Sequence, residues 1–573
     1  MTGDDDLWLR VAELRFTGRQ PERAAQLLLR VGRQALDRGA LATASAVLGR
    51  GRELARPGPL RTDLGRALLE ALTSAGDLQA LELGETVLAE AEPAAEAEIY
   101  LLLARAALTA GHTDDARAHL DRIPTGADAA LAARAAAVAA HLALAEVGVD
   151  RLRTAERLAD HAAQAATAAK LPEVACEALE VLGRCARVTS LARAEEAFTD
   201  ALQIAERAGS QVWRVRALNE LGTISMFRDV RPDRLEQARH EADQAGAVAT
   251  AAGIDVNLAA LYVMRAEYPA AVEAAQRCHR TASAYRLPVL AAAELFHGVI
   301  ATHQGRFADM ARHIKAAEAL AGDDPDILVG TWAMCRAMRS LLQENRPRAH
   351  HEFAVAQARL TDRPALAINP SEGPRLLLRA VDGQASTDEV ADFAGSRANG
   401  SRWTDLWAGL AAAAVTADPD GVEAALVVAA PMPLFRALGL RLVAERALHD
   451  GWGDPPAWLG ESAMFFTDRH PRVASACRSM LRHAGMPAPR DRRVDREVHS
   501  RLRRLGVTAR EAEVLELVGE RAGNREIAAR LHLSARTVEK HVANLLRKTG
   551  ATDRAALVLA AEDRGVAPIR PPT

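Results

Sequence analysis

Cysteine and aromatic residues are scarce in this sequence of 573 residues, and each shortage excludes a class of structure. The five cysteines are odd in number and form no CxxC pair. We therefore expect neither a disulfide framework nor a structural zinc site. This use of cysteine fits a protein of the reducing cytoplasm. Aromatic residues make up only 4% of the chain. A core must then consist mainly of Ala, Leu and Val, which suits closely packed helices.

Lysine is scarcer still, and its placement excludes an ATPase of the P-loop class. It occurs only at Lys170, Lys315, Lys540 and Lys548. None of the four follows a glycine, so the phosphate-binding motif GxxxxGK[ST] is absent. The GxGxxG, GxSxG and HExxH motifs are absent too. The run His350-His351-Glu352 imitates a metal cluster, but consecutive helical residues point about 100° apart. We predict no catalytic site, no cofactor and no metal.

Long apolar runs and a leader sequence are also missing. No uninterrupted apolar run reaches the roughly 18 residues of a membrane span. The N-terminus, Met1 to Asp6, is acidic, whereas a secretory signal is basic and then apolar. We expect a soluble, cytoplasmic protein without membrane contact. Arginine supplies 68 of the 72 basic residues, and with the abundance of alanine this resembles proteins of high-GC bacteria.

What the sequence does contain, over residues 1–484, is a repeating helical pattern. Apolar residues recur three and four apart, and short turns interrupt them every 35 to 42 residues. The turns centre on Gly39, Gly76, Gly111, Gly148, Ser190, Asp229, Glu267, Gly305, Asn345 and Gly383. This period predicts helix pairs stacked into an α-solenoid, with small residues where helices cross. Over most of residues 20–345 the pattern resembles tetratricopeptide repeats. Prolines and glycines between 364 and 401 predict a break in the array.

Aromatic residues in the second half of this region allow two interpretations. They are Tyr262, Tyr268, Tyr285, Phe296 and Trp332. A pocket lined by them could hold a small ligand. Alternatively, they fill gaps that an alanine-rich core leaves, and this is the interpretation we favour. Trp403 and Trp407 are four apart, which is ordinary core spacing.

The C-terminal part differs in charge and in pattern. The segment from 490 to 573 has 18 basic and 12 acidic residues, whereas the remainder has 54 and 63. A basic segment on an acidic body suggests contact with a polyanion. We predict a linker over 485–502, a small helical domain over 503–566 and a tail over 567–573. The fold class is therefore all-α, a solenoid followed by a four-helix domain.

Capping residues divide that domain into helices. Thr508 and Glu511 form the capping box of a first helix. Asn524 is a good cap for a second helix, and Ser534 caps a third. In the third helix Val538, Val542, Leu545 and Leu546 share one face, whereas Arg536, Glu539, Lys540, Ala543 and Arg547 share the other. A helix with one packed face and one polar, basic face is suited to enter the DNA major groove. An ordinary solvated face is the alternative, and the capped three-helix spacing weighs against it.

These capped helices closely resemble the LuxR-type (GerE-type) helix-turn-helix domain over about residues 503–565. The resemblance rests on Thr508-Ala509-Arg510-Glu511, Val514-Leu515, Asn524-Arg525-Glu526-Ile527-Ala528, Leu531, Ser534, Thr537-Val538, His541, Asn544, Lys548 and Arg554. It implies a recognition helix at 535–549 with Glu539, Lys540 and Ala543 at base edges. The DNA-binding residues that we expect are Arg525, Ser534, Arg536, Thr537, Glu539, Lys540, His541, Ala543, Asn544, Arg547, Lys548 and Arg554. Of these, Arg525, Arg536, Thr537, His541, Lys548 and Arg554 would approach phosphates or nearby helix ends.

Three positions depart from the usual family pattern. Glu539 stands where lysine is common; glutamate can accept a hydrogen bond from cytosine but repels phosphate. Arg521 stands where a glycine usually ends the first helix, so we expect a rebuilt turn between Gly519 and Gly523. Thr549 replaces a usual leucine. The overall layout also resembles large LuxR-type regulators with an N-terminal ATPase, of which this chain looks like the C-terminal half without the ATPase.

The sequence therefore favours a DNA-binding transcriptional regulator that binds double-stranded DNA. The resemblance implies a homodimer on DNA through the last helix, about residues 554 to 564. The helical repeats would receive a small-molecule or protein signal. The alternative is a helical-repeat scaffold for protein interaction with a vestigial DNA-binding domain.

Overall fold

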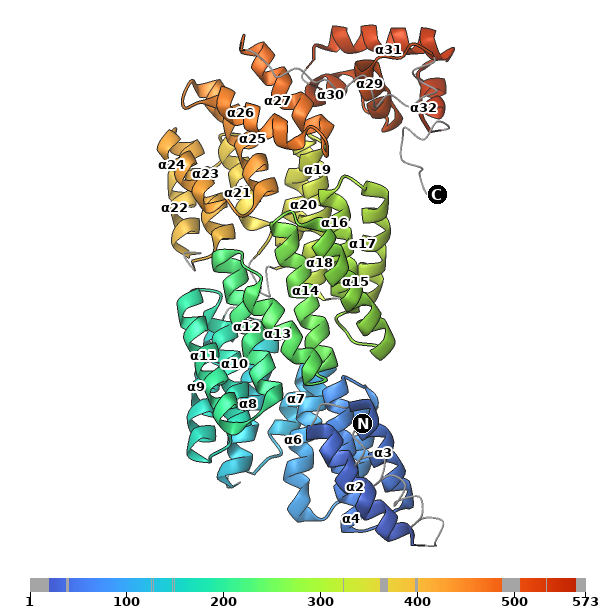
Figure 1. The fold of residues 1–573 in the computed structure, drawn as a ribbon, viewed down its shortest axis with the longest axis vertical. Helices are drawn as coiled ribbons and strands as arrows, with labels where there is room; N and C mark the ends of the chain where they lie inside the picture. The colour runs from blue at the N-terminus through green and yellow to red at the C-terminus, as the bar shows by residue number, and fades with distance from the viewer. Residues whose placement is uncertain are drawn as a thin grey trace.

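The computed structural model describes residues 20–37, 41–124, 126, 128–146, 148, 150–322, 324–360, 369–396, 400–486, 505–531 and 533–562. Within these ranges every regular element is a helix, and there is no strand. The helices form a long antiparallel array with a small helical domain at its C-terminal end (Figure 1). The predicted all-α class is thus confirmed. Most of the linker 485–502, and the tail 567–573, lie outside the described residues.

The long array consists of helices joined in sequential, mostly antiparallel pairs (Figure 1). Its helices are α2 (Pro21–Asp37), α3 (Leu41–Leu54), α4 (Pro59–Ala75), α5 (Gln79–Glu90), α6 (Pro93–Thr109), α7 (Thr113–Leu120), α8 (Ala129–Ala145), α9 (Arg151–Ala168), α10 (Pro172–Ala186), α11 (Leu191–Ala208), α12 (Gln211–Asp229), α13 (Asp233–Gln244), α14 (Val248–Met264), α15 (Tyr268–Tyr285), α16 (Leu290–His303), α17 (Phe307–Ala321), α18 (Pro325–Gly330), η1 (Thr331–Ala337), α19 (Met338–Leu342), α20 (Arg346–Ala358), α21 (Glu372–Val381), α22 (Thr387–Ser396), α23 (Arg402–Thr416), α24 (Pro419–Val428), α25 (Pro433–Asp450), α26 (Pro455–Phe466) and α27 (Pro471–His483). Many begin with proline, whose fixed φ and missing N–H suit the first helical turn.

The turns within the helix pairs lie where the sequence predicts them. Nine of the ten predicted centres fall between the two helices of a pair or at their ends, from Gly76 in the pair α4–α5 to Gly383 in the pair α21–α22, and the tenth, Gly39, lies outside the described residues. Gly76 and Gly305 have φ of 72° and 74°, the left-handed region that glycine tolerates. At Val230 and Glu344 a non-glycine residue takes the same conformation, with φ of 57° and 56°. The paired helices form a tetratricopeptide-like α-solenoid.

Small residues allow the helices to approach closely, as predicted. A Cβ atom at Gly183 of α10 would lie 2.4 Å from the ring of Phe198 in α11. At Gly84 of α5 it would lie 2.3 Å from the side chain of Leu103. These glycines therefore make room for the few large side chains of an alanine-rich core.

The core is divided differently in the two halves of the solenoid. Before α12 the buried residues form several small clusters, each limited to neighbouring helices. From Val215 to Leu481 most of them belong to one large cluster, beside a small one of Ala252, Cys278 and Ala293. The large cluster includes Leu377 of α21, which lies inside the predicted break at 364–401, and Leu406 of α23, which follows it. The described part of that segment holds two ten-residue helices, and the core continues past them.

The aromatic residues mostly fill this core. Tyr268 is buried, whereas Tyr285 is exposed at the end of α15. Tyr262, Phe296 and Trp332 are partly buried against the core on three different helices. Trp403 and Trp407 pack edge-on against Phe435, with centroids 4.8 Å and 6.3 Å away. The gap-filling interpretation is therefore the one that their positions support.

The C-terminal domain has a separate small core. It contains α29 (Ala509–Gly519), α30 (Asn524–Arg530), α31 (Ala535–Thr549) and α32 (Arg554–Glu562). Its buried residues run from Val507 to Val558 and include none from the solenoid. None of the helices that the structure describes is long and apolar enough to cross a membrane.

Candidate nucleic-acid interface

One face of helix α31 packs in the core of the domain, and the opposite face is exposed. Ser534 is its N-cap, and the Ser534 Oγ accepts a hydrogen bond from the Thr537 amide at 3.1 Å. Val538, Val542 and Leu545 are buried in the domain core. The predicted cap and the predicted packed face are both present. Figure 1 shows that α31 lies along the outer edge of the domain.

The opposite face of α31 carries exposed polar side chains. Its exposed residues are Arg536, Glu539, Lys540, Ala543 and Arg547. Among the described residues, Arg536, Glu539 and Lys540 have no ion pair, and Arg547 donates only to Asn544 Oδ1 at 3.2 Å. Side chains at consecutive turns of one helix that find no partner within the chain are available to a partner outside it.

Lys548, one of the predicted DNA-binding residues, forms an ion pair within the domain. Lys548 Nζ lies 2.6 Å from Glu511 Oε2. The same carboxylate accepts the Thr508 amide at 2.8 Å, which completes the predicted capping box of α29. Burial disfavours the charge, but Lys548 and Thr508 outweigh it and hold the pKa of Glu511 below its usual range. The N-terminus of α29 is thereby tied to the C-terminal end of α31.

Arg554 ties the start of α32 to the start of α30. It donates to Asn524 Oδ1 at 2.7 Å and to the Ala522 carbonyl at 2.6 Å. The prediction that Asn524 caps the second helix is wrong: Gly523 is the N-cap and Asn524 is the first helical residue. The Asn524 Oδ1 atom accepts from Arg554, and the position that a cap would occupy is held by Gly523. Next to it, Arg525 is exposed and has no ion pair among the described residues.

The remaining predicted residues lie at the rim of the exposed face. Thr537, His541 and Asn544 are half-buried. Burial of the ring, with Arg510 close by, lowers the pKa of His541, so its imidazole is neutral near pH 7. Thr537 Oγ1 lies 2.7 Å from Ser534 Oγ. These side chains can donate hydrogen bonds but do not add positive charge.

The turn after α29 is not rebuilt around the flanking glycines as expected. Arg521 itself has φ of 62°, the left-handed conformation for which a glycine would be the easier residue. Gly519 ends α29, and Gly523 has an extended conformation. The turn therefore still contains one residue in the left-handed conformation, and that residue is Arg521. Thr549 donates to the Leu545 carbonyl at 2.7 Å, a bond that a leucine could not make.

The C-terminal domain is docked on the end of the solenoid, which the sequence did not reveal. Arg472 of α27 donates to Glu516 Oε2 of α29 at 3.0 Å and to Oε1 of Glu520, the residue just after α29, at 3.3 Å. Arg510 donates to Ser475 Oγ at 3.3 Å. We call these contacts the docking seam. Burial raises the pKa of Glu516 despite Arg472, whereas Arg472 and Arg530 outweigh burial and lower the pKa of Glu520.

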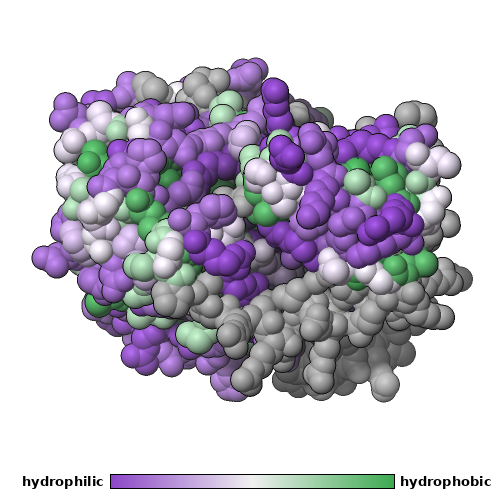
Figure 2. Space-filling model, turned by 90° about the horizontal axis from the view of Figure 1, so that it is seen from above, coloured by the Kyte–Doolittle hydropathy of each residue, from purple (hydrophilic) through white to green (hydrophobic). Residues whose placement is uncertain are grey.

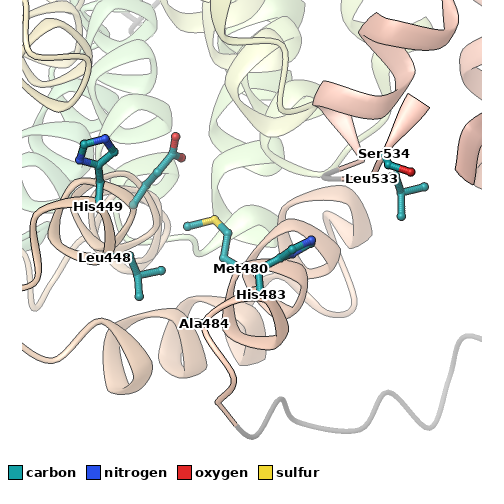
Figure 3. A pocket seen from close by; sticks show the side chains of 8 residues that line it. Leu448, His449, Met480, His483, Ala484, Leu533 and Ser534 are labelled. Atoms are coloured by element: carbon teal, nitrogen blue, oxygen red, sulfur yellow. The ribbon is translucent and has the colours of Figure 1, made fainter. Parts of the chain in front are cut away.

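A hollow of about 530 Å³ lies beside the docking seam. It is lined by Glu445, Leu448, His449, Met480, His483, Ala484, Leu533 and Ser534 (Figure 3). The last two belong to the turn before α31, while the others belong to the solenoid and its end. Seen from this end of the molecule, the coloured surface is mostly hydrophilic, with small separate hydrophobic areas (Figure 2).

Comparison with known proteins identifies this domain. Residues 506–561 match the family model "Bacterial regulatory proteins, luxR family". Over 63 residues the chain is 46% identical to response regulator Rre1 of Synechocystis sp., which covers 11% of this chain and 27% of Rre1. Over 152 residues it is 29% identical to response regulator VraR of Staphylococcus aureus, which covers 25% of this chain and 68% of VraR. The C-terminal domain is a LuxR-type helix-turn-helix domain, the DNA-binding domain of bacterial regulators.

The solenoid has more distant structural neighbours. A Rap protein complexed with competence and sporulation factor has a TM-score of 0.43 and 14% identity, over 59% of this chain and 98% of that one. Yeast Tom70 has a TM-score of 0.33 and 13% identity, over 75% of this chain and 96% of that one. These scores are too low to carry an argument, so the solenoid assignment rests on its own helix pairs and turns.

Proposed function

We propose that this protein is a transcriptional regulator whose helix α31 enters the major groove of double-stranded DNA. The observation that carries this proposal is a capped helix with one packed face and one polar face, on which Arg536, Glu539 and Lys540 have no ion pair among the described residues. Glu539, Lys540 and Ala543 point from successive turns of that face, as a base-reading helix requires.

Phosphate contacts are assigned to the rim of this face. Arg536 lies in the first turn of α31, where the free N–H groups of the helix also favour an anion. Arg525 occupies the first turn of α30, exposed and without an ion pair among the described residues. Lys548 and Arg554, by contrast, hold helix ends within the domain and position the reading helix.

Two copies of the domain would bind two half-sites through α32. Leu557 and Val558 of this helix are buried in the core of their own domain, so a dimer must use other residues of the helix. The solenoid would receive the signal that controls binding, because it ends in direct contact with α29 at the docking seam.

The test is selection of DNA from a random pool by the full chain, followed by affinity measurements at several salt concentrations. We expect an enriched palindromic motif and an affinity that falls steeply with salt, because counterions are released from the phosphates. An absence of enrichment, or salt-independent binding, would favour the scaffold with a vestigial domain.

A further inference from the structure

A small cavity in the solenoid gathers more positive charge than its carboxylates can neutralise. The cavity has a volume of about 160 Å³ and lies between α17, η1, α19 and α20. It is lined by Met310, Ala311, Ile314, Lys315, Glu318, Arg336, Arg339, Arg348 and Glu352. Four cationic side chains thus meet two carboxylates.

Both carboxylates are already paired. Arg336 donates to both oxygens of Glu318, at 2.8 Å and 3.1 Å. Arg348 Nε donates to Glu352 Oε1 at 2.8 Å, and Glu352 also accepts from Ser340. The two pairs leave no carboxylate of the cavity free for the other two cations.

Lys315 and Arg339 are those two cations, and within the described residues neither has an ion pair or a hydrogen bond to another side chain. Lys315 is exposed at the mouth, whereas Arg339 is half-buried, with its guanidinium 5.4 Å from the ring centre of Phe307. Burial, followed by the charge of Arg348, lowers the pKa of Arg339. An uncompensated guanidinium in such a place is unfavourable, and an anion in the cavity would compensate it.

We propose that this cavity binds a small phosphate dianion, free or as the end of a phosphate monoester. Lysine and the planar fork of arginine are the side chains that recognise phosphate. The bound charge would compensate Lys315 and Arg339, for which the cavity holds no free carboxylate. This site does not rest on the proposed function.

Calorimetric titration of the full chain with inorganic phosphate, at constant ionic strength in chloride, tests the site. We expect one saturable site in the wild type and about tenfold or greater weakening in Lys315→Ala and in Arg339→Gln, as loss of a charge-assisted hydrogen bond implies. Arg312→Ala is the matched control, because Arg312 is exposed on the same helix and does not line the cavity. Absence of saturable heat, or equal weakening by Arg312→Ala, would overturn the site.

Lys315→Ala decides the question if Arg339→Gln fails to fold, since Lys315 is exposed. A titration with glycerol 3-phosphate separates the two sources: tighter binding than inorganic phosphate identifies a monoester, and weaker binding identifies the free ion.

These titrations contain no DNA, so a failure of DNA binding would contradict only the proposed function.

Discussion

The solenoid and the recognition helix use charged side chains in opposite ways. In the solenoid, arginines bridge neighbouring helices: Arg216 donates to both oxygens of Glu180 at 2.8 Å, and Arg346 reaches Glu445 at 2.7 Å. On the exposed face of α31, Arg536, Glu539 and Lys540 form no ion pair with any described residue. Where a charge is satisfied within the chain it contributes to the fold, and where it is left free it is available to a partner.

The largest effect should follow from breaking the most buried bridge. Arg441 is 1% exposed and donates to Glu344 at 2.6 Å and Glu445 at 2.7 Å. Despite burial, Arg441 and Arg346 hold the pKa of Glu445 at about 2. Arg441→Ala would leave Glu344 without its partner and Glu445 with Arg346 alone, and we expect about 3–5 kcal/mol loss of unfolding free energy in urea.

The matched control is Arg50→Ala, which removes an exposed pair with Glu53 and should change stability by about 1 kcal/mol or less. Equal effects of the two substitutions would contradict the distinction between buried and exposed pairs in the solenoid.

Close helix approach in the solenoid can be broken at a single glycine. Gly183→Ala places a Cβ 2.4 Å from Phe198, and such overpacking should destabilise by about 1–3 kcal/mol. Gly253→Ala in α14 meets nothing within 4 Å and should stabilise by up to about 1 kcal/mol, because alanine is the better helix former. Opposite shifts of the urea midpoint are expected; shifts of the same sign would show that packing at Gly183 is not limiting.

The free charges of the domain should act on DNA and not on stability. Lys540→Ala should remove about 1–3 kcal/mol of discrimination between the selected site and a mutated site. Arg525→Ala should weaken both sites equally and reduce the salt slope by about 1. Anisotropy titrations of the full chain measure both quantities. If the two variants gave the same pattern, the division into base and phosphate contacts would be wrong.

Local rules explain which features could be predicted from the sequence. Turns at Gly76 or Gly305, and the caps at Thr508 and Ser534, depend on residues within a few positions, so pattern alone was sufficient. The prediction that Asn524 caps α30 is wrong because its side chain accepts a hydrogen bond from Arg554, thirty residues away, and Gly523 is the cap. The docking seam was missed for the same reason: nothing local distinguishes Arg472 from the other arginines, and its partners lie in another domain.

The internal pair of Lys548 and Glu511 predicts that the stability of the C-terminal domain depends on pH. The pKa of Glu511 is lowered in the folded domain, so its stabilisation is present above the ordinary carboxyl pKa and is lost as pH falls through the folded value. Glu511→Gln should therefore flatten the acid side of the stability curve of a fragment covering 490–573, followed by circular dichroism. Glu526→Gln, at an exposed position, is the control and should leave the curve unchanged.

The smallest expected effect is at Ser534, where two substitutions distinguish a role in stability from a role in DNA binding. Ser534→Ala removes the cap of α31 and should cost about 1 kcal/mol in the same fragment. Ser534→Asp keeps an oxygen for the Thr537 amide and should restore most of that stability. Its negative charge, however, lies in the first turn beside the expected phosphate contacts, so the full chain should bind DNA more weakly than with alanine. Recovery of stability together with full DNA affinity would place Ser534 away from the phosphates and would restrict its role to the fold.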